Sequence, residues 1–135
     1  MTERKLIHDD LTQSAIAAFY EVYNILGFGF LEYVYVAAFE RELRNRGHTL
    51  NRELSVPVWY KGEDICSQRI DLLVDDSLIL EVKSSTLLPP TAIRQLYSYL
   101  RATDLEIGLV LHFGPEAKFY RQILTNDRKN RPAGV

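Results

Sequence analysis

Apolar residues near the start of the chain recur every three or four positions. The repeat consists of Ala15, Phe19, Val22 and Leu26. This spacing is typical of a helix with one face in the core, and it predicts a helix from about Asp10 to Leu26. Asp9 or Asp10 can cap its N-terminus, and Gly27 can end it.

The pattern changes from helical to alternating near residue 50. Before the change, a second helix is predicted over about 31–46, with Gly47 as its C-terminal stop. After it, residues rich in β-branched and aromatic side chains predict a meander of three strands, at about 53–60, 65–74 and 78–84. Proline cannot donate a ladder hydrogen bond, so Pro57 indicates that the first strand lies at an edge or carries a bulge.

One more helix and two strands are predicted after the meander. Pro90 precedes a third helix over about 91–103. The apolar run 106–114 predicts a strand, and 117–124 predicts a final strand, with a helix as the alternative. The predicted order is therefore α-α-β-β-β-α-β-β, a chain of the α/β (α+β) class.

We expect one domain over residues 1–135. This length is close to the commonest domain size, and the sequence contains no linker or repeat. The core is predicted over about 10–124, and the polar residues 125–135 are predicted to fray. The net charge of −2 does not suggest a non-specific nucleic-acid binder, although a local basic patch stays open.

The single cysteine, Cys66, excludes a disulfide within the chain and disfavours a cysteine-based zinc site. Because it falls in a predicted strand, we expect a buried thiol. No apolar run reaches membrane-spanning length, and the N-terminus lacks the apolar core of a signal peptide. We therefore expect a cytoplasmic protein without a membrane partner.

Charged residues interrupt the predicted hairpin over 69–85. A turn centred on Asp76 pairs Asp71 with Glu81. Side chains alternate between the faces of a strand, so Asp71, Glu81 and Lys83 share one face. The other face is entirely apolar and consists of Leu72, Val74, Leu78, Leu80 and Val82.

Two opposed carboxylates need an explanation, because like charges across a sheet destabilise it by ~0.2–1 kcal/mol. A cation between Asp71 and Glu81 removes the repulsion. Two carboxylates, a main-chain carbonyl and water form an oxygen-rich site that suits Mg²⁺ or Mn²⁺. The alternative is an ion-pair ladder, in which Lys83 and Arg69 neutralise the two acids on an exposed face. The hairpin alone leaves both interpretations open.

Two helical residues could belong to the same site. Glu32 lies in the first turn of the second helix, where an acid stabilises the helix dipole by ~0.3–1 kcal/mol. It is also one helical step from Tyr35, on a face that could point to the sheet. Gln95 precedes Tyr99 by one turn of the third helix, although a lone glutamine is usually a surface residue. Both tyrosines are expected to pack behind the site.

These segments resemble a known family. "GFLEYVY" contains G-x-x-E-x-x-Y at Gly29, Glu32 and Tyr35, and "RIDLLVDDSLILEVKSS" resembles the D…E-x-K core of the PD-(D/E)xK nuclease superfamily. "RQLYSYLRATDLEIGLVLHFG" resembles the Q-x-x-x-Y-L helix and following strand of that superfamily. From about residue 10 to 124 the chain resembles the GxxExxY family of small PD-(D/E)xK-like proteins. One departure is Ile70, which stands where a proline often precedes the aspartate.

The resemblance implies a restriction-endonuclease-like core, with a mixed central sheet flanked by helices, and a metal-dependent phosphodiesterase that acts on nucleic acid, DNA more than RNA. It implies Mg²⁺ or Mn²⁺ on Asp71, Glu81 and the main-chain carbonyl of Val82, with Glu32 at a second metal or beside Lys83. Lys83 would orient or activate the attacking water, and Gln95 would orient water or a phosphate oxygen. The implied catalytic residues are Glu32, Asp71, Glu81, Lys83 and Gln95.

Positive side chains are needed to contact a nucleic-acid substrate. The predicted contacts are Arg94, Arg101, Lys118 and Arg121, with an ordinary solvated surface as the alternative. Trp59, Tyr60 and Phe119 could stack on bases, but we expect them to pack in the core. The three histidines, His8, His48 and His112, show no ligand spacing, and no role is predicted for them.

A catalytically inactive module with the same fold, binding nucleic acid or a protein partner, is the main alternative to an enzyme. Intact Asp71, Glu81 and Lys83 argue against it, because a site without function has no reason to keep opposed carboxylates. The sequence leaves a homodimer open.

Overall fold

The computed structural model describes residues 8–129. Its elements are α1 (Asp9–Leu26), α2 (Glu32–Asn45), β1 (Leu50–Tyr60), β2 (Glu63–Val74), β3 (Leu78–Ser84), α3 (Thr91–Ala102), β4 (Ile107–Phe113), β5 (Ala117–Ile123) and the 3-10 helix η1 (Asn126–Arg128). This order confirms the predicted one, and residues 117–123 form a strand. None of the helices in the described part of the chain is long and apolar enough to cross a membrane.

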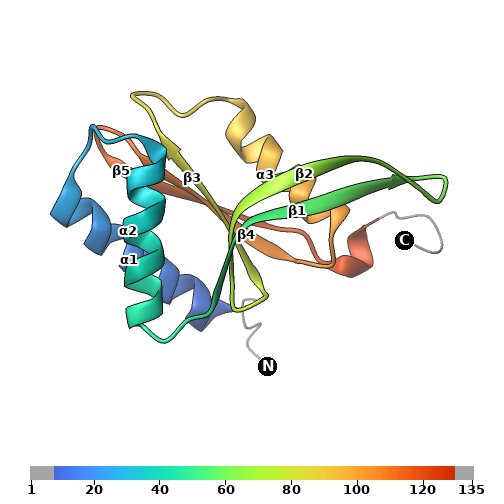
Figure 1. Ribbon diagram of the computed structural model, residues 1–135, viewed down its shortest axis with the longest axis horizontal. Coiled ribbons are helices and arrows are strands. Elements are labelled where there is room, and N and C mark those ends of the chain that lie inside the picture. Colours follow the sequence, from blue (N-terminus) through green and yellow to red (C-terminus); the bar gives the residue numbers. More distant parts are fainter. Residues whose placement is uncertain (1–7, 130–135) are drawn as a thin grey trace, which may run out of the picture.

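The strands form one sheet in the order β1-β2-β3-β4-β5. β3 and β4 are parallel, and the other neighbours are antiparallel. Parallel strands need a crossover connection, and α3 provides it. α1 and α2 cover one face of the sheet, while α3 lies against the other (Figure 1). The fold is therefore the predicted mixed sheet flanked by helices.

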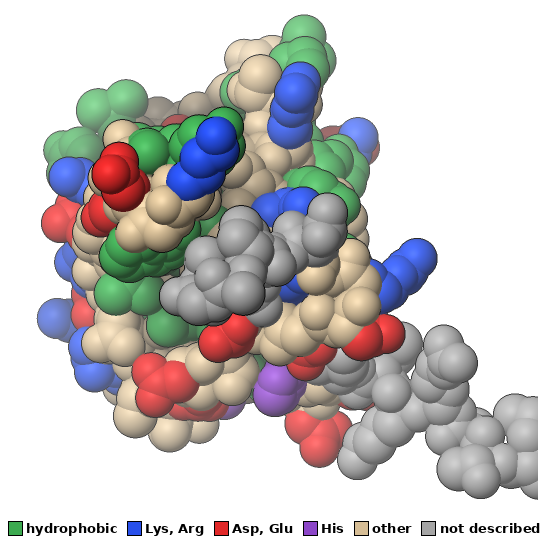
Figure 2. Space-filling view, turned by 90° about the vertical axis from the view of Figure 1, so that its right-hand side faces the viewer, with side chains coloured by type: hydrophobic (Ala, Val, Ile, Leu, Met, Phe, Trp, Pro, Cys, Tyr) green, Lys and Arg blue, Asp and Glu red, His purple; other side chains and the backbone are tan. Residues whose placement is uncertain are grey.

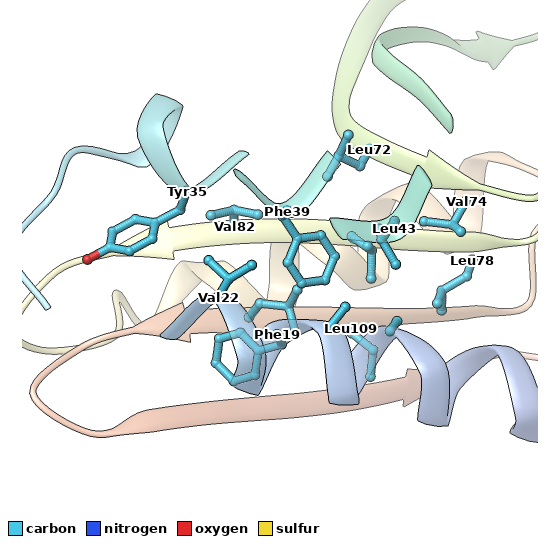
Figure 3. Packing of buried hydrophobic residues seen from close by; sticks show 14 of the residues in the cluster. Phe19, Val22, Tyr35, Phe39, Leu43, Leu72, Val74, Leu78, Val82 and Leu109 are labelled. Carbon is cyan, nitrogen blue, oxygen red and sulfur yellow. The ribbon is translucent and has the colours of Figure 1, made fainter. Parts of the chain in front are cut away.

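The larger core lies between the sheet and the α1–α2 pair. Its strand residues include the whole apolar face predicted for the hairpin: Leu72, Val74, Leu78, Leu80 and Val82. Figure 3 shows Phe19 and Val22 from α1 and Phe39 and Leu43 from α2 meeting these strand residues. The alternating pattern of the hairpin thus identified which side of the sheet is apolar.

The smaller core lies between the sheet and α3. Leu73 and Ile79 of the hairpin pack here against Leu96 and Leu100 of α3. A Cβ atom at Gly108 of β4 would collide with the side chain of Leu96, so a glycine at this position lets α3 approach the sheet closely. This close contact fixes the height of α3 above the strands.

The helix ends partly match the predictions. α1 begins after His8, which has φ 51° and makes no capping hydrogen bond, so Asp9 and Asp10 occupy the first turn instead of the cap. Both acids still favour the helix dipole there. Gly27 ends the helix with φ 68°, as predicted. Of the predicted frayed tail, residues 126–128 form η1, and residues 130–135 lie outside the described part of the chain.

β1 and β2 form a hairpin arm that extends beyond the rest of the sheet (Figure 1). β1 is an edge strand with a register shift between Val58 and Trp59, which confirms the prediction from Pro57. Trp59 and Tyr60 are 43% and 58% exposed, so their predicted core packing is wrong. Cys66 is also exposed, contrary to the expected buried thiol. The reason is shared: only residues 72–74 of β2 pair with β3, so within residues 8–129 no further strand lies beside the outer part of the arm.

Candidate metal and catalytic site

The candidate site lies where β2 separates from β3. Their ladder ends at the pair Leu72–Leu80, one residue before the predicted pair of Asp71 and Glu81. Beyond it, the Asp71 N–H donates to Glu81 Oε1 at 3.1 Å, and the Val82 N–H donates to Asp71 Oδ2 at 3.0 Å. The two carboxylates therefore replace main-chain hydrogen-bond partners and lie between the strands, which diverge at this point (Figure 1).

β1 bends at the same level. The β1–β2 register leaves out Glu53, which lies opposite Asp71 and has φ 54°. A left-handed conformation costs a residue with a side chain ~1–2 kcal/mol. In a regular strand, Ile70 and Leu72 would share one face of the sheet. Here they lie on opposite faces, because Ile70 packs with α3 whereas Leu72 packs with α1 and α2. The rotation of the strand at Asp71 turns the aspartate toward Glu81.

Glu81 is the buried member of the carboxylate pair, with 2% of its surface exposed. Burial raises its pKa and the neighbouring charge of Asp71 raises it further, to about 8, although the Asp71 N–H and the charge of Lys83 act in the opposite direction. Near neutral pH the pair therefore holds a proton that a cation can replace.

Lys83 and Gln95, which were predicted separately, lie in direct contact. The Lys83 ammonium donates to Gln95 Oε1 at 3.1 Å, which joins β3 to α3. Tyr99 lies one turn further along α3 and is buried. Its ring packs in the smaller core, and burial together with the nearby charges of Glu81 and Asp71 raises the pKa of Tyr99 far above its usual range.

The α1–α2 loop is held at the end of β3 by Tyr35. The Tyr35 hydroxyl donates to the carbonyl of Gly27 and accepts from the N–H of Phe30. Ser84 follows Lys83 in β3, and its hydroxyl donates to the carbonyl of Phe30. Figure 3 shows the Tyr35 ring in the core with its hydroxyl pointing outward. The tyrosine of the GxxExxY pattern thus fixes the loop that precedes Glu32.

Glu32 and Asp71 line one pocket of about 200 Å³. Its other lining residues are Tyr33, Val36, Arg52 and Glu53. Sequence reasoning missed Arg52, which pairs with Glu40 at 3.1 Å, and Glu53. Counting straight back from the β1–β2 turn would have paired Glu53 with Ile70, and the register shift between Val58 and Trp59 moves Glu53 opposite Asp71. The pocket brings Glu32 to the carboxylate side of the site, not to the side of Lys83 and Gln95.

The oxygen donors fit a small hard cation. In an extended strand the N–H and C=O of one residue point to the same side, so the Val82 carbonyl is expected to face β2 together with its N–H. Asp71, Glu81 and this carbonyl would suit Mg²⁺ or Mn²⁺. Within residues 8–129, no three or more His, Cys, Asp and Glu side chains are grouped closely enough to hold a metal, so Glu32 does not join the pair as a direct ligand in this conformation.

The predicted phosphate contacts do not gather around the carboxylates. Arg94 and Arg101 are two helical turns apart on α3, on the side of the half-exposed Tyr97 that faces away from the sheet. Lys118 is exposed on β5 and pairs with Glu116 at 3.6 Å. Arg121 is half-buried on the opposite face of β5, toward α1. Only Lys118 shares a face of the sheet with Lys83.

A second polar cluster was missed by sequence reasoning and lies at the turn of the same hairpin. His48 Nδ1 lies 2.7 Å from Asp75 Oδ2, and His48 Nε2 lies 2.7 Å from the hydroxyl of Ser14 on α1. Since the carboxylate only accepts, Nδ1 donates to it, and Nε2 forms the second hydrogen bond with the Ser14 hydroxyl. Asp75 also accepts from the Thr49 N–H at 2.8 Å.

This Ser14–His48–Asp75 chain connects three elements but lacks the surroundings of a hydrolase. Ser14 lies inside α1, where the main-chain N–H groups donate within the helix and cannot stabilise an oxyanion. Partial burial opposes the charge of Asp75, but the hydrogen bonds from Thr49 and His48 outweigh it and lower its pKa. We therefore interpret the chain as a brace that fixes α1 and the α2–β1 loop to the hairpin turn.

The comparisons with known proteins agree with this geometry. A family model of the PD-(D/E)XK nuclease superfamily matches residues 9–123. No curated protein matches the chain. A solved structure described as "Crystal structure of SSO0001" is similar in fold, with a TM-score of 0.54 and 19% sequence identity over 87% of this chain. The matched part spans 59% of that structure's chain. The family match covers most of the chain, which therefore belongs to the PD-(D/E)XK nuclease superfamily.

Proposed function

We propose that this protein is a metal-dependent nuclease that hydrolyses phosphodiester bonds of nucleic acid, and of DNA rather than RNA. The observation that carries the proposal is the pair of Asp71 and the buried Glu81, with Lys83 beside it. The Glu81 carboxylate accepts from the Asp71 N–H, and the Asp71 carboxylate accepts from the Val82 N–H. Two carboxylates held close together in this way, with the pKa of Glu81 at about 8, form an arrangement that costs stability without a cation. We further propose that the chain is one domain of the GxxExxY group and that it acts in the cytoplasm.

The residues divide the work by their chemistry. Asp71, Glu81 and the carbonyl of Val82 would hold Mg²⁺ or Mn²⁺, and Glu32 would contact the hydration shell of that ion or a second one. When bound, such an ion lowers the pKa of a coordinated water and stabilises negative charge on a phosphate.

Lys83 supplies the positive charge that attracts the scissile phosphate to the site. Its ammonium is held by Gln95 at 3.1 Å, so both groups face the same volume beside the carboxylates. From there Lys83 can orient the attacking water, and the Gln95 amide can bind water or a phosphate oxygen. Tyr35 and Tyr99 act indirectly by holding the loop and α3 in place.

A nuclease-fold module without catalysis is the second candidate, and one observation favours it. The hairpin arm exposes Trp59, Tyr60 and Ile65, which is a suitable surface for a protein partner or a second copy of the chain. Such a module would have no need for carboxylate-dependent metal binding.

Cleavage of labelled single-stranded, double-stranded and branched DNA and of RNA tests the proposal. Each substrate is incubated with Mg²⁺ or Mn²⁺, and a Glu81→Gln protein purified in parallel controls for contaminating nucleases. Glutamine keeps the acceptor for the Asp71 N–H, so the fold should survive. Metal-dependent cutting by the wild type alone is expected. Equal activity of both proteins, or none in either, would contradict it.

A further inference from the structure

Exposed aromatic side chains lie on one flank of the end of β3. Phe28 and Phe30 in the α1–α2 loop are each 44% exposed, and Tyr33 in the first turn of α2 is 68% exposed. The loop is not a free tip, because Ser84 and Tyr35 both hold Phe30 by hydrogen bonds to its main chain. These rings are therefore presented to solvent at the end of β3, and Tyr33 lines the same pocket as Asp71.

A groove of about 400 Å³ lies on the other flank. Leu87 of the β3–α3 loop, His112 of β4, and Lys118 and Tyr120 of β5 are among its lining residues. Lys83 is in register with His112, and His112 is in register with Lys118. Residues in register on adjacent strands share a face, so Lys83, His112 and Lys118 form a row that leads from the carboxylates into the groove.

His112 has an unused hydrogen-bonding atom. The residue is 5% exposed, and its Nε2–H donates to the carbonyl of Ser85 at 2.9 Å. The neutral ring then has a lone pair at Nδ1, and this atom has no partner within residues 8–129. Buried polar atoms nearly always have one, so the hydrogen bonding of this groove-lining residue is incomplete, although the Nδ1 atom itself is enclosed and a ligand would reach it only after a local rearrangement.

The charges around the site are too sparse for a duplex. Proteins that follow double-stranded DNA neutralise many phosphates with Lys and Arg. Here the net charge is −2, and Arg44 and Arg46 are paired with Glu40 and Glu42 on their own helix. Figure 2 shows basic and acidic side chains interspersed on the side that carries the hairpin arm, so this side offers no continuous basic surface for a duplex either. Single strands instead bind through stacking on aromatic rings with few phosphate contacts.

We propose that the substrate is single-stranded DNA, with unpaired bases against Phe28, Phe30 and Tyr33 and one nucleotide of the same strand in the groove of His112 and Lys118. In this arrangement the scissile phosphate lies between the two flanks, at Asp71, Glu81 and Lys83. The inference rests on the proposed function and adds its substrate class.

The test is fluorescence anisotropy with a labelled 12-nucleotide strand, in Ca²⁺ so that binding is measured without turnover. Tyr33→Ala should weaken binding about 5- to 20-fold, since one stacked base contributes an effect of this size. Lys118→Ala should also weaken binding, because it removes a positive charge that can contact a phosphate. Tyr60→Ala, which removes an equally exposed aromatic residue from the hairpin arm, should change binding less than twofold. A blunt duplex of the same length should bind at least tenfold more weakly than the single strand.

Several outcomes would overturn the inference. These are equal or tighter binding of the duplex, tenfold tighter binding of the RNA strand of the same sequence, or unchanged affinity in both variants. Cleavage assays separate its failure from that of the proposed function. Cutting of duplex but not of single strands would reject the substrate class alone, whereas variant-sensitive strand binding without any cutting would reject the nuclease and keep the binding surface.

Discussion

Two polar clusters lie on one hairpin, four residues apart, and they are built in opposite ways. At the turn, the charge of Asp75 has donors on both carboxylate oxygens, from His48 and Thr49. In the strands, Asp71 and Glu81 face each other, and burial together with the like charge raises the pKa of Glu81 to about 8. The first cluster is complete within the chain. In the second cluster the repulsion between the two carboxylates is removed only by a proton or a cation. This difference distinguishes the structural brace from the proposed cation site.

The largest effect should come from Lys83. Lys83→Gln removes the charge next to the carboxylates and keeps a polar side chain that can still reach Gln95, so the fold should be retained. We expect metal-dependent cleavage to fall by roughly 10²–10⁴-fold, which is typical for loss of a group that transfers or orients a proton. Single-turnover rates with excess enzyme measure this loss. Activity within threefold of the wild type would mean that Lys83 only pairs with the acids.

Glu81→Gln should stabilise the protein in the absence of metal. The folded state raises the pKa of Glu81 from 4.5 to about 8, so it binds the proton more tightly than the unfolded chain. Wild-type stability should therefore fall as the pH rises from 4.5 to 8, and the glutamine variant should not share this loss. We expect a gain of ~1–4 kcal/mol above pH 8.

Urea unfolding with EDTA at pH 5 and pH 8.5 measures this gain. The two proteins should differ little at the lower pH and clearly at the higher one. A Glu81→Gln protein that is less stable than the wild type at both pH values would show that the Asp71–Glu81 pair stabilises the fold. The contrast with the Asp75 cluster would then be wrong.

Asp75→Asn should destabilise the protein, and its effect on the free energy of unfolding should be smaller than that of Glu81→Gln. The folded state lowers the pKa of Asp75, so its contribution is present above the unfolded pKa and is lost as the pH falls through the folded one. Because the side chain is about one-third exposed, screening limits the loss, and we expect ~0.5–1.5 kcal/mol at pH 7 and a smaller difference once the pH is low enough to protonate Asp75 in the folded state.

Thermal unfolding of the Asp75→Asn and Ser14→Ala proteins tests the brace at both ends. Cleavage should stay close to the wild-type rate in each, because neither residue touches the candidate site. A large loss of cleavage with an intact fold would give the cluster a functional role.

Local patterns in the sequence predicted the helices, the strands and the carboxylate pair. A tight turn at residues 75–77 fixes the register of its two strands, so Asp71 and Glu81 could be located from spacing alone. The brace could not be found this way, because Ser14, His48 and Asp75 meet only after three elements have packed. The same holds for the bend at Glu53, which depends on where β2 leaves β3.

Burial was the least predictable property. Trp59, Tyr60 and Cys66 are residue types that are common in buried strands. The alternation of polar and apolar residues does not show how far the neighbouring strand extends along them. β3 pairs with only three residues of β2, so the outer arm stays exposed. Conversely, Tyr35 is polar in character, yet it is fully buried because its hydroxyl reaches the main chain of the α1–α2 loop.

The central claim is that the Asp71–Glu81 pair is a cation site and that the Asp75 cluster is not. Isothermal titration of Mn²⁺ into the wild type, Glu81→Gln and Asp75→Asn proteins tests it most directly. We predict that the wild type and Asp75→Asn proteins bind Mn²⁺ with the same affinity and that Glu81→Gln weakens binding at least tenfold. Equal Mn²⁺ binding by all three proteins, or no binding by the wild type, would contradict the account.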